Sequence, residues 1–216
     1  MARQIAHEIK NPLTPMRLSI QHLVRLKQKN VPEWQSKFDD IATTLIEQID
    51  ILSEAASEFS SFSRFYSEEL TEVNLKALIK EQITLFNTRD NLEITLDTQL
   101  KNALIIARKG QIIRVLVNLI SNAVQATEHK SSGEIIATLS AESDYITLSI
   151  EDNGPGVPDE FVNKLFKPNF TTKSGGTGLG LYICRSIIEQ SQGTITYSRS
   201  EKLGGACFTF ALKKSE

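Results

Sequence analysis

Residues 110–128 read GQIIRVLVNLISNAVQATE, and this run decides how the second half of the chain folds. Its apolar residues occur on nearly every side of a helix, so we expect a largely buried helix. Asn118 and Asn122 nevertheless stand one turn apart on one face, and Arg114 lies one turn earlier. A buried amide without partners costs about 1–3 kcal/mol. The pair is therefore either a polar stripe satisfied by neighbouring backbone or two amide oxygens directed at a metal–phosphate ligand.

The segments around this helix alternate between helix and strand patterns. Asn74 is placed to cap a helix that ends near Asn87, and another helix begins near Gly178. Strand patterns cover residues 92–98, 103–107, 134–141, 145–152, 193–199 and 206–213, of which the last two form a hairpin. This alternation predicts an α/β sandwich over residues 73–216.

Two glycine-rich stretches stand out in that half. Residues 152–156, DNGPG, follow a strand, where a carboxylate can accept from an exocyclic amine and glycines allow close approach to a flat base. Taken alone, this stretch is more typical of an ordinary turn than of a binding site. Residues 175–181, GGTGLGL, enter a helix and would present free N–H groups to phosphates. This second stretch matches neither the P-loop nor the dinucleotide pattern.

Residues 2–66 carry almost no strand signal. Apolar residues recur at three- and four-residue steps before and after Asn30-Val31-Pro32, which predicts two long amphipathic helices in an antiparallel hairpin. A lone hairpin cannot bury both stripes, so we expect two copies to pair into a four-helix bundle. Pro12 and Pro15 should kink the first helix. Residues 67–72 are the predicted linker.

One of the three histidines differs from the others. His22 and His129 are interpreted as surface or filling residues. His7 has Glu8 beside it and Asn11 one turn later, immediately before a proline. A neighbouring carboxylate can hold the proton on one ring nitrogen while the other nitrogen acts as nucleophile.

Taken in order, residues 118–123, 152–156, 166–173 and 176–181 resemble the N, G1, F and G2 boxes of histidine-kinase catalytic domains. Those domains belong to the superfamily that includes gyrase, Hsp90 and MutL. Residues 6–15, AHEIKNPLTP, resemble the H box of sensor histidine kinases of two-component systems. Together the resemblances cover residues 2–213. They imply an α+β multidomain fold: a helical hairpin at 1–66 forming a dimeric four-helix bundle, a linker at 67–72, and an ATP-binding α/β sandwich at 73–216.

The resemblance also implies roles for individual residues. His7 would be phosphorylated, Glu8 would be the general base or orienting acid, and Asn11 would serve response-regulator dephosphorylation. ATP and Mg²⁺ would be the cofactors. Asn122 and Asn118 would bind the metal, and residues 153–177 would form a mobile lid over the nucleotide. The residues implied to bind the nucleotide are Asn118, Asn122, Asp152, Gly154, Gly156, Lys173, Gly176, Thr177, Gly178, Leu179 and Gly180. Asp152 would hold the adenine amine.

Asn118 stands where the hydrolysing relatives carry a catalytic glutamate, which suits a site that must not activate water. The sequence departs from the family at Gln125, where many histidine kinases have Lys or Arg. Charge compensation would then come from Mg²⁺, backbone amides and Lys173, although Lys173 can equally be an exposed lid lysine.

The resemblance predicts an ATP-dependent kinase that phosphorylates His7 and passes the group to an aspartate of a response-regulator receiver domain, with phosphatase activity as well. The receiver domain would dock near His7, with Arg17 and Gln21 as contacts. One alternative is an ATP-hydrolysing conformational clamp, and another is a non-catalytic dimeric scaffold. Asn118 and the block around His7 argue against the clamp, and the intact nucleotide boxes argue against the scaffold.

Composition sets the remaining expectations. The 216 residues have a formal net charge of −2, which gives no general attraction to nucleic acid, so we expect none to bind directly. No apolar run approaches the roughly 20 residues of a membrane span. Only six residues precede His7. We therefore expect sensor and membrane segments to be missing, leaving a cytoplasmic, homodimeric fragment of a protein anchored in the inner membrane.

Overall fold

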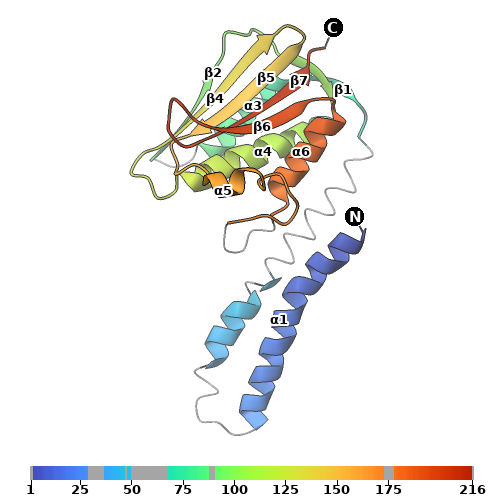
Figure 1. Cartoon of the computed structure of the whole chain (residues 1–216), viewed down its shortest axis with the longest axis vertical. Helices are drawn as coiled ribbons and strands as arrows, with labels where there is room; N and C mark the ends of the chain where they lie inside the picture. The colour runs from blue at the N-terminus through green and yellow to red at the C-terminus, as the bar shows by residue number, and fades with distance from the viewer. Residues whose placement is uncertain are drawn as a thin grey trace. The chain divides into compact units, whose positions relative to one another are not determined.

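The computed structural model describes residues 2–28, 37–46, 48–49, 68–87, 91–172 and 178–215, with side chains from residue 13 onward. The chain divides into two compact units: Met1–Tyr66 with Thr171–Thr177, and Ser67–Phe170 with Gly178–Glu216. Each unit is described by itself (Figure 1).

The first unit contains helix α1, Ala2–Gln28, in which Pro12 and Pro15 lie without ending the helix. Residues 37–46 and 48–49 are also helical, and the expected connection at 30–34 lies outside the described residues. Large apolar side chains remain exposed, among them Leu18 at 56% and Ile46 at 60%. The four-helix bundle stays a prediction, because the structure holds a single chain. No helix in the described ranges has the length and apolar character needed to cross a membrane.

The second unit is an α/β sandwich, as the sequence predicts. Its five-stranded sheet has the order β2-β4-β5-β7-β6, in which β2 and β4 are parallel and the other neighbours antiparallel. The strands are β2 (Leu92–Asp97), β4 (Gly133–Glu142), β5 (Tyr145–Asp152), β6 (Thr194–Arg199) and β7 (Ala206–Lys213). Helices α3 (Leu75–Phe86), α4 (Lys109–Ala126) and α6 (Gly180–Gln190) pack on one face of the sheet (Figure 1).

Two short elements differ from the expected pattern. Strand β1, Thr71–Asn74, pairs antiparallel with β3, Leu104–Ala107, so the last two residues of the predicted linker belong to a strand. Val73 is the one apolar residue of Thr71–Asn74, so the segment shows no strand pattern, and the pairing with β3 reveals it. Helix α5, Asp159–Val162, lies inside the stretch expected to be loop.

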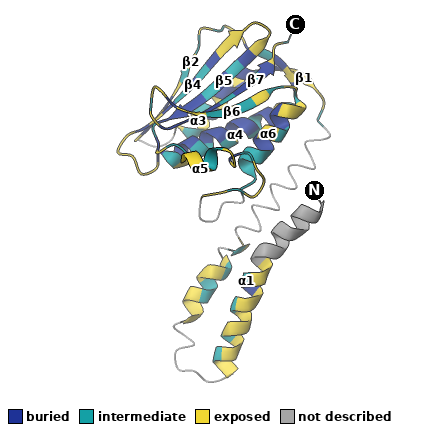
Figure 2. Ribbon diagram, in the orientation of Figure 1, coloured by how far each residue is buried: buried dark blue, intermediate teal, exposed yellow. Residues whose placement is uncertain are grey.

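The core lies between the sheet and its helices. Alternate residues of β4 and β5 are buried, and α4 is buried along the side that meets them (Figure 2). Asn74 caps α3 through a hydrogen bond from the amide of Ala77, as predicted. The expectation that α4 is largely buried holds on the side that meets the sheet, whereas Val117 is 36% exposed. Val117 borders the face of α4 that carries Asn118 and Asn122, both of which are half-buried.

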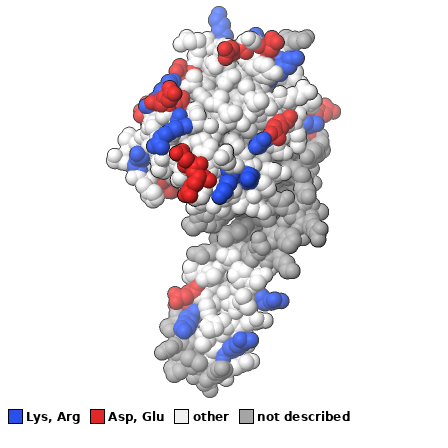
Figure 3. Space-filling model, in the orientation of Figure 1, with Lys and Arg blue, Asp and Glu red and all other residues white. Residues whose placement is uncertain are grey.

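The opposite face of the sheet is rich in hydroxyl groups. The strand register aligns Thr138, Ser149, Thr209 and Thr196 across four strands. On the face viewed in Figure 3, charged side chains of both signs lie mostly near the rim of this unit. Among the described residues of this unit, Asn118 and Asn122 lie on helix α4, and Asp152 lies at the end of strand β5.

Candidate nucleotide-binding site

Asn118 and Gly180 bring the middle of α4 against the start of α6. The Asn118 Nδ2 donates to the Arg114 carbonyl oxygen over 3.1 Å, so the amide nitrogen is satisfied by the preceding turn of its own helix. A Cβ built on Gly180 would stand 2.5 Å from Asn118 Oδ1. The polar-stripe interpretation therefore holds for the nitrogen of Asn118, whereas its oxygen lies at the junction of α4 and α6. Asn122, one turn later, is half-buried.

Asp152 ends β5 and is only 2% exposed. Its Oδ1 accepts hydrogen bonds from the backbone amides of Gly154, at 2.9 Å, and Ala206, at 3.1 Å. Burial raises the pKa of the Asp152 carboxyl above 3.8, and the two backbone hydrogen bonds oppose that rise. Neither bond reaches Oδ2, so a buried carboxylate is held in a fixed orientation by one oxygen.

The turn after Asp152 is tied down on both sides. Asn153 donates from Nδ2 to the Ser132 carbonyl at 2.9 Å, and its Oδ1 accepts from the Glu134 amide at 3.1 Å. A Cβ on Gly154 would lie 2.9 Å from the Ala126 carbonyl oxygen, and Gly156 has a φ of +73°. The turn interpretation of residues 152–156 is therefore confirmed, whereas their contact with a base stays a prediction.

Sequence reasoning missed the residues behind Asp152. The Gly205 amide donates to the Asp152 carbonyl oxygen at 3.1 Å, and a Cβ on Gly205 would collide with that oxygen and with Oδ1. The Tyr197 hydroxyl accepts from the Val157 amide at 3.0 Å, which braces the far end of the turn. The sequence signal that could have revealed Gly205 was the Gly204-Gly205 pair. The predicted hairpin turn already accounted for that pair, so no contact with Asp152 was inferred from it.

The residues between this turn and α6 pack through aromatic rings. The Phe161 and Phe170 ring centroids lie 5.5 Å apart, and Phe166 meets Phe208 edge to face at 6.3 Å. Gly178, with a φ of +69°, lies so close to Phe170 that a Cβ would stand 2.7 Å from the Phe170 amide nitrogen. Leu179 is the N-cap residue of α6 and makes no side-chain cap. Lys173, Gly176 and Thr177 lie outside the described residues.

The comparison with protein families settles what this arrangement is. Residues 107–216, about half of the chain, match the model of the histidine kinase-, DNA gyrase B- and HSP90-like ATPases. The chain belongs to this ATPase family.

Several relatives within the ATPase family are signal-transduction histidine kinases, which confirms the resemblance found in the sequence. Nitrogen regulation protein NtrY of Azorhizobium caulinodans is 32% identical over 99% of this chain and 28% of its own length. The histidine-protein kinase AtoS of Escherichia coli is 34% identical over 96% of this chain and 33% of its own. The chain spans about a third of the length of these curated relatives.

Solved structures agree with the ATPase fold. The catalytic domain of histidine kinase ThkA is 37% identical, covers 68% of this chain and 96% of its own, and has a TM-score of 0.62. ThkA in complex with response regulator TrrA is 31% identical, covers 100% of this chain and 61% of its own, and has a TM-score of 0.65. The α/β catalytic fold of the second unit is therefore that of a histidine kinase.

The remaining predicted residues of this ATPase lie in the first unit. His7, Glu8 and Asn11 fall within α1, but their side chains lie outside the described residues. His22 and His129 are both exposed, in agreement with their interpretation as surface residues.

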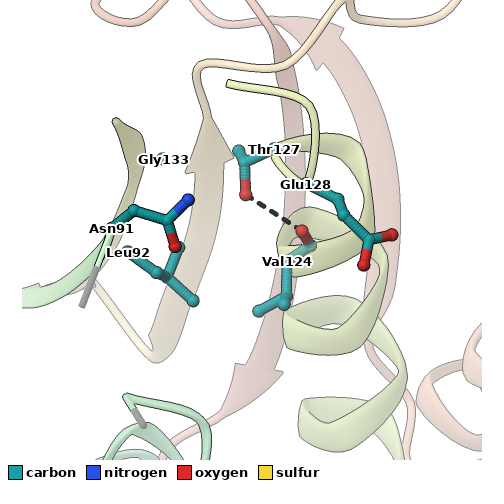
Figure 4. Close-up of a pocket in the computed structure, with 6 residues that line it drawn as sticks. All are labelled: Asn91, Leu92, Val124, Thr127, Glu128 and Gly133. Atoms are coloured by element: carbon teal, nitrogen blue, oxygen red, sulfur yellow. Dashed lines mark hydrogen bonds between the residues drawn. The ribbon is translucent and has the colours of Figure 1, made fainter. Parts of the chain in front are cut away.

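A pocket at the end of α4 involves none of the predicted site residues of the ATPase. Figure 4 shows it between the last turn of α4 and the starts of β2 and β4, lined by Asn91, Leu92, Val124, Thr127, Glu128 and Gly133. The Thr127 hydroxyl donates to the Val124 carbonyl over 3.0 Å, which ends the helix there. Within the described ranges no three His, Cys, Asp or Glu side chains gather as a metal site.

Proposed function

We propose that the chain is the kinase core of a two-component sensor: it transfers the γ-phosphoryl group of ATP to His7 and then to an aspartate of a response regulator. The observation that carries the proposal is the anchored carboxylate of Asp152. Two backbone amides hold its Oδ1, and Gly154 and Gly156 allow the chain to turn tightly beside it, where a Cβ on Gly154 would strike Ala126. A base carrying an exocyclic amine fits such an acceptor.

Asp152 Oδ2 would accept from the adenine amine, and the phosphates would lie toward the start of α6. Gly178 and Leu179 lead into that helix, which begins at Gly180, and the helix dipole favours negative charge at this end. The proposal assigns Gly176, Thr177 and Lys173 to the same phosphates. Gly180 also keeps this helix end clear of Asn118.

Asn122 and Asn118 would hold Mg²⁺. Their amide oxygens are hard donors one turn apart on α4, and Mg²⁺ takes few protein ligands when phosphates and water complete its shell. When bound, Mg²⁺ supplies charge neutralisation for the β- and γ-phosphates. An asparagine at 118 cannot remove a proton from water, so this side chain favours transfer to another nucleophile over hydrolysis.

His7 would be that nucleophile. An imidazole is mostly neutral near pH 7, and Glu8 would hold the proton on the nitrogen that does not attack. Asn11 would orient water in the reverse reaction, the dephosphorylation of the response regulator. In-line transfer depends mainly on positioning, so movement about the linker would control the rate.

A response-regulator receiver domain and a second copy of the chain would be the partners. ThkA has been solved in complex with the response regulator TrrA, which supports the first. The exposed apolar residues of the first unit support the second, because a four-helix bundle would cover them: Leu18, Ile20, Val24, Ile46 and Ile49. Attachment to the inner membrane through segments outside this chain completes the proposal.

Labelling with γ-phosphate-labelled ATP and Mg²⁺ tests the function. We expect acid-labile, base-stable label on the chain, its complete loss in His7→Ala, and its retention in the control His22→Ala, which changes an exposed histidine of the same helix. Steady ATP hydrolysis without label would contradict the proposal in favour of the clamp. Neither label nor hydrolysis would contradict it in favour of the scaffold.

A further inference from the structure

Helix α4 begins without a cap of its own. Arg108 occupies the N-cap position and makes no side-chain cap, and the first turn holds no acidic residue. The N-terminal amides of a helix need acceptors, and its positive end favours a carboxylate nearby. Arg108 and the following Lys109 place positive charge there instead.

Glu68 supplies the missing acceptor from another part of the chain. Its Oε2 accepts from the Gly110 amide at 3.0 Å, and its carbonyl oxygen accepts from Arg108 Nε at 2.8 Å. The two contacts are reciprocal, since the side chain of each partner meets the backbone of the other segment. A Cβ on Gly110 would run into both carboxylate oxygens of Glu68. We call Glu68, Arg108 and Gly110 the clasp.

The clasp lies where the chain enters the catalytic unit. Glu68 stands three residues before β1, which is itself fixed by its ladder with β3. At the end of that ladder, the Ser215 hydroxyl donates to Glu72 Oε2 at 3.0 Å. The clasp therefore moves the last anchored point of the incoming chain from Thr71 back to Glu68.

We propose that Glu68 is a positioning residue for phosphoryl transfer, an inference that rests on the proposed function. The clasp fixes where the tether from the histidine-bearing unit joins α4, the helix that carries Asn118 and Asn122. Opening it would add residues 68–70 to the tether, up to about 10 Å of chain. A longer tether lowers the effective concentration of one site at another, and in-line transfer is sensitive to that loss.

Three variants of the present chain test the proposal. Glu68→Ala removes the carboxylate, and Gly110→Ala displaces it by the added Cβ while favouring helix formation. Glu69→Ala is the matched control, because Glu69 is the exposed neighbouring glutamate. We expect the rate of His7 labelling at saturating ATP to fall about three- to tenfold in both clasp variants, with the KM for ATP within about twofold of wild type. Glu68→Gln, which keeps an acceptor oxygen, should recover part of the rate.

The two clasp variants separate positioning from stability. If only Glu68→Ala were slow, the carboxylate would merely stabilise α4, and the proposal would be overturned. Unchanged rates in both variants, or a slower rate explained by a higher KM, would overturn it too. Hydrogen exchange of the Gly110 amide needs no kinase activity and should be faster in Glu68→Ala; equal exchange would overturn the clasp. Absence of label in the wild-type chain would refute the proposed function instead.

Discussion

Gly180 lies against Asn118: a Cβ at position 180 would stand 2.5 Å from the Asn118 amide oxygen. This contact joins the helix end assigned to the phosphates with the helix face assigned to Mg²⁺. The Asn118 amide oxygen can therefore occupy its position only because residue 180 has no side chain.

Replacing Gly180 with alanine should impair nucleotide binding more than folding. The added methyl group must push Asn118 aside, so we expect ATP affinity measured by calorimetry with Mg²⁺ to fall about tenfold. Alanine is the better helix former, so the free energy of unfolding should change by less than about 1 kcal/mol. Ser186→Ala, further along α6, is the control and should bind ATP as wild type does. If Gly180→Ala bound ATP with wild-type affinity, the assignment of Asn118 to the nucleotide site would be contradicted.

Replacing Asp152 with asparagine should weaken ATP binding without lowering the stability of the fold. Asp152→Asn keeps an Oδ1 that can accept from Gly154 and Ala206, but it replaces the other carboxylate oxygen with an amide donor that opposes the adenine amine. We expect ATP affinity to fall at least about tenfold, whereas the melting temperature at pH 7 stays equal or rises. Asp97→Asn, which changes an exposed aspartate of β2, should alter neither quantity.

The same substitution should change how stability depends on pH. Burial raises the pKa of Asp152 above 3.8, so just above that pH the folded protein retains a proton that the unfolded chain has lost. Wild-type stability therefore decreases as pH rises through this window and is then constant with respect to this group. Asp152→Asn lacks that decrease, so the free energy of unfolding of the variant relative to wild type, measured in urea, should increase as pH rises above 3.8. A constant difference at all pH values would contradict the shifted pKa.

The elements with long periodic patterns could be predicted from the sequence. Helix α4 and strand β5 were expected at 110–128 and 145–152, and they span Lys109–Ala126 and Tyr145–Asp152. Their burial repeats over several turns or pleats, which gives a local signal. Strand β1 has Val73 as its one apolar residue and pairs with β3, so no local pattern could reveal it.

The site residues also divide into those with a local sequence signal and those that depend on a distant partner. The sequence singled out Asp152 and Asn118 because their motifs are local and occur in a fixed order, and their roles toward the nucleotide stay predictions. Gly205 could not be singled out in this way, because it acts on a carboxylate more than fifty positions earlier, and its Gly-Gly pair already suited a hairpin turn. Glu68 was assigned to the linker for a similar reason, since its acceptor role depends on Gly110 in another element.

Ser200 should stabilise a buried carboxylate beside the site. Its hydroxyl donates to Glu151 Oε2 at 2.7 Å and accepts from the Leu203 amide at 2.9 Å. Ser200→Ala leaves Glu151 without this donor, so we expect the free energy of unfolding to fall by about 1–3 kcal/mol. Adding Glu151→Gln should cost less than the sum of the single changes in a double-mutant cycle of urea unfolding. Strict additivity would show that the hydroxyl does not act through Glu151.

The two glycines of the β6–β7 turn offer a matched pair around Asp152. A Cβ on Gly205 would collide with the Asp152 carbonyl and Oδ1, so Gly205→Ala should lower the free energy of unfolding by about 1–3 kcal/mol and displace the carboxylate. A Cβ on Gly204 meets nothing within 4 Å, and its φ of +82° alone should cost about 1 kcal/mol in Gly204→Ala. Calorimetry should therefore find ATP binding lost in Gly205→Ala and kept in Gly204→Ala. Equal losses of affinity in the two variants would mean that the turn acts through general stability, and the role of Gly205 in holding Asp152 would have to be abandoned.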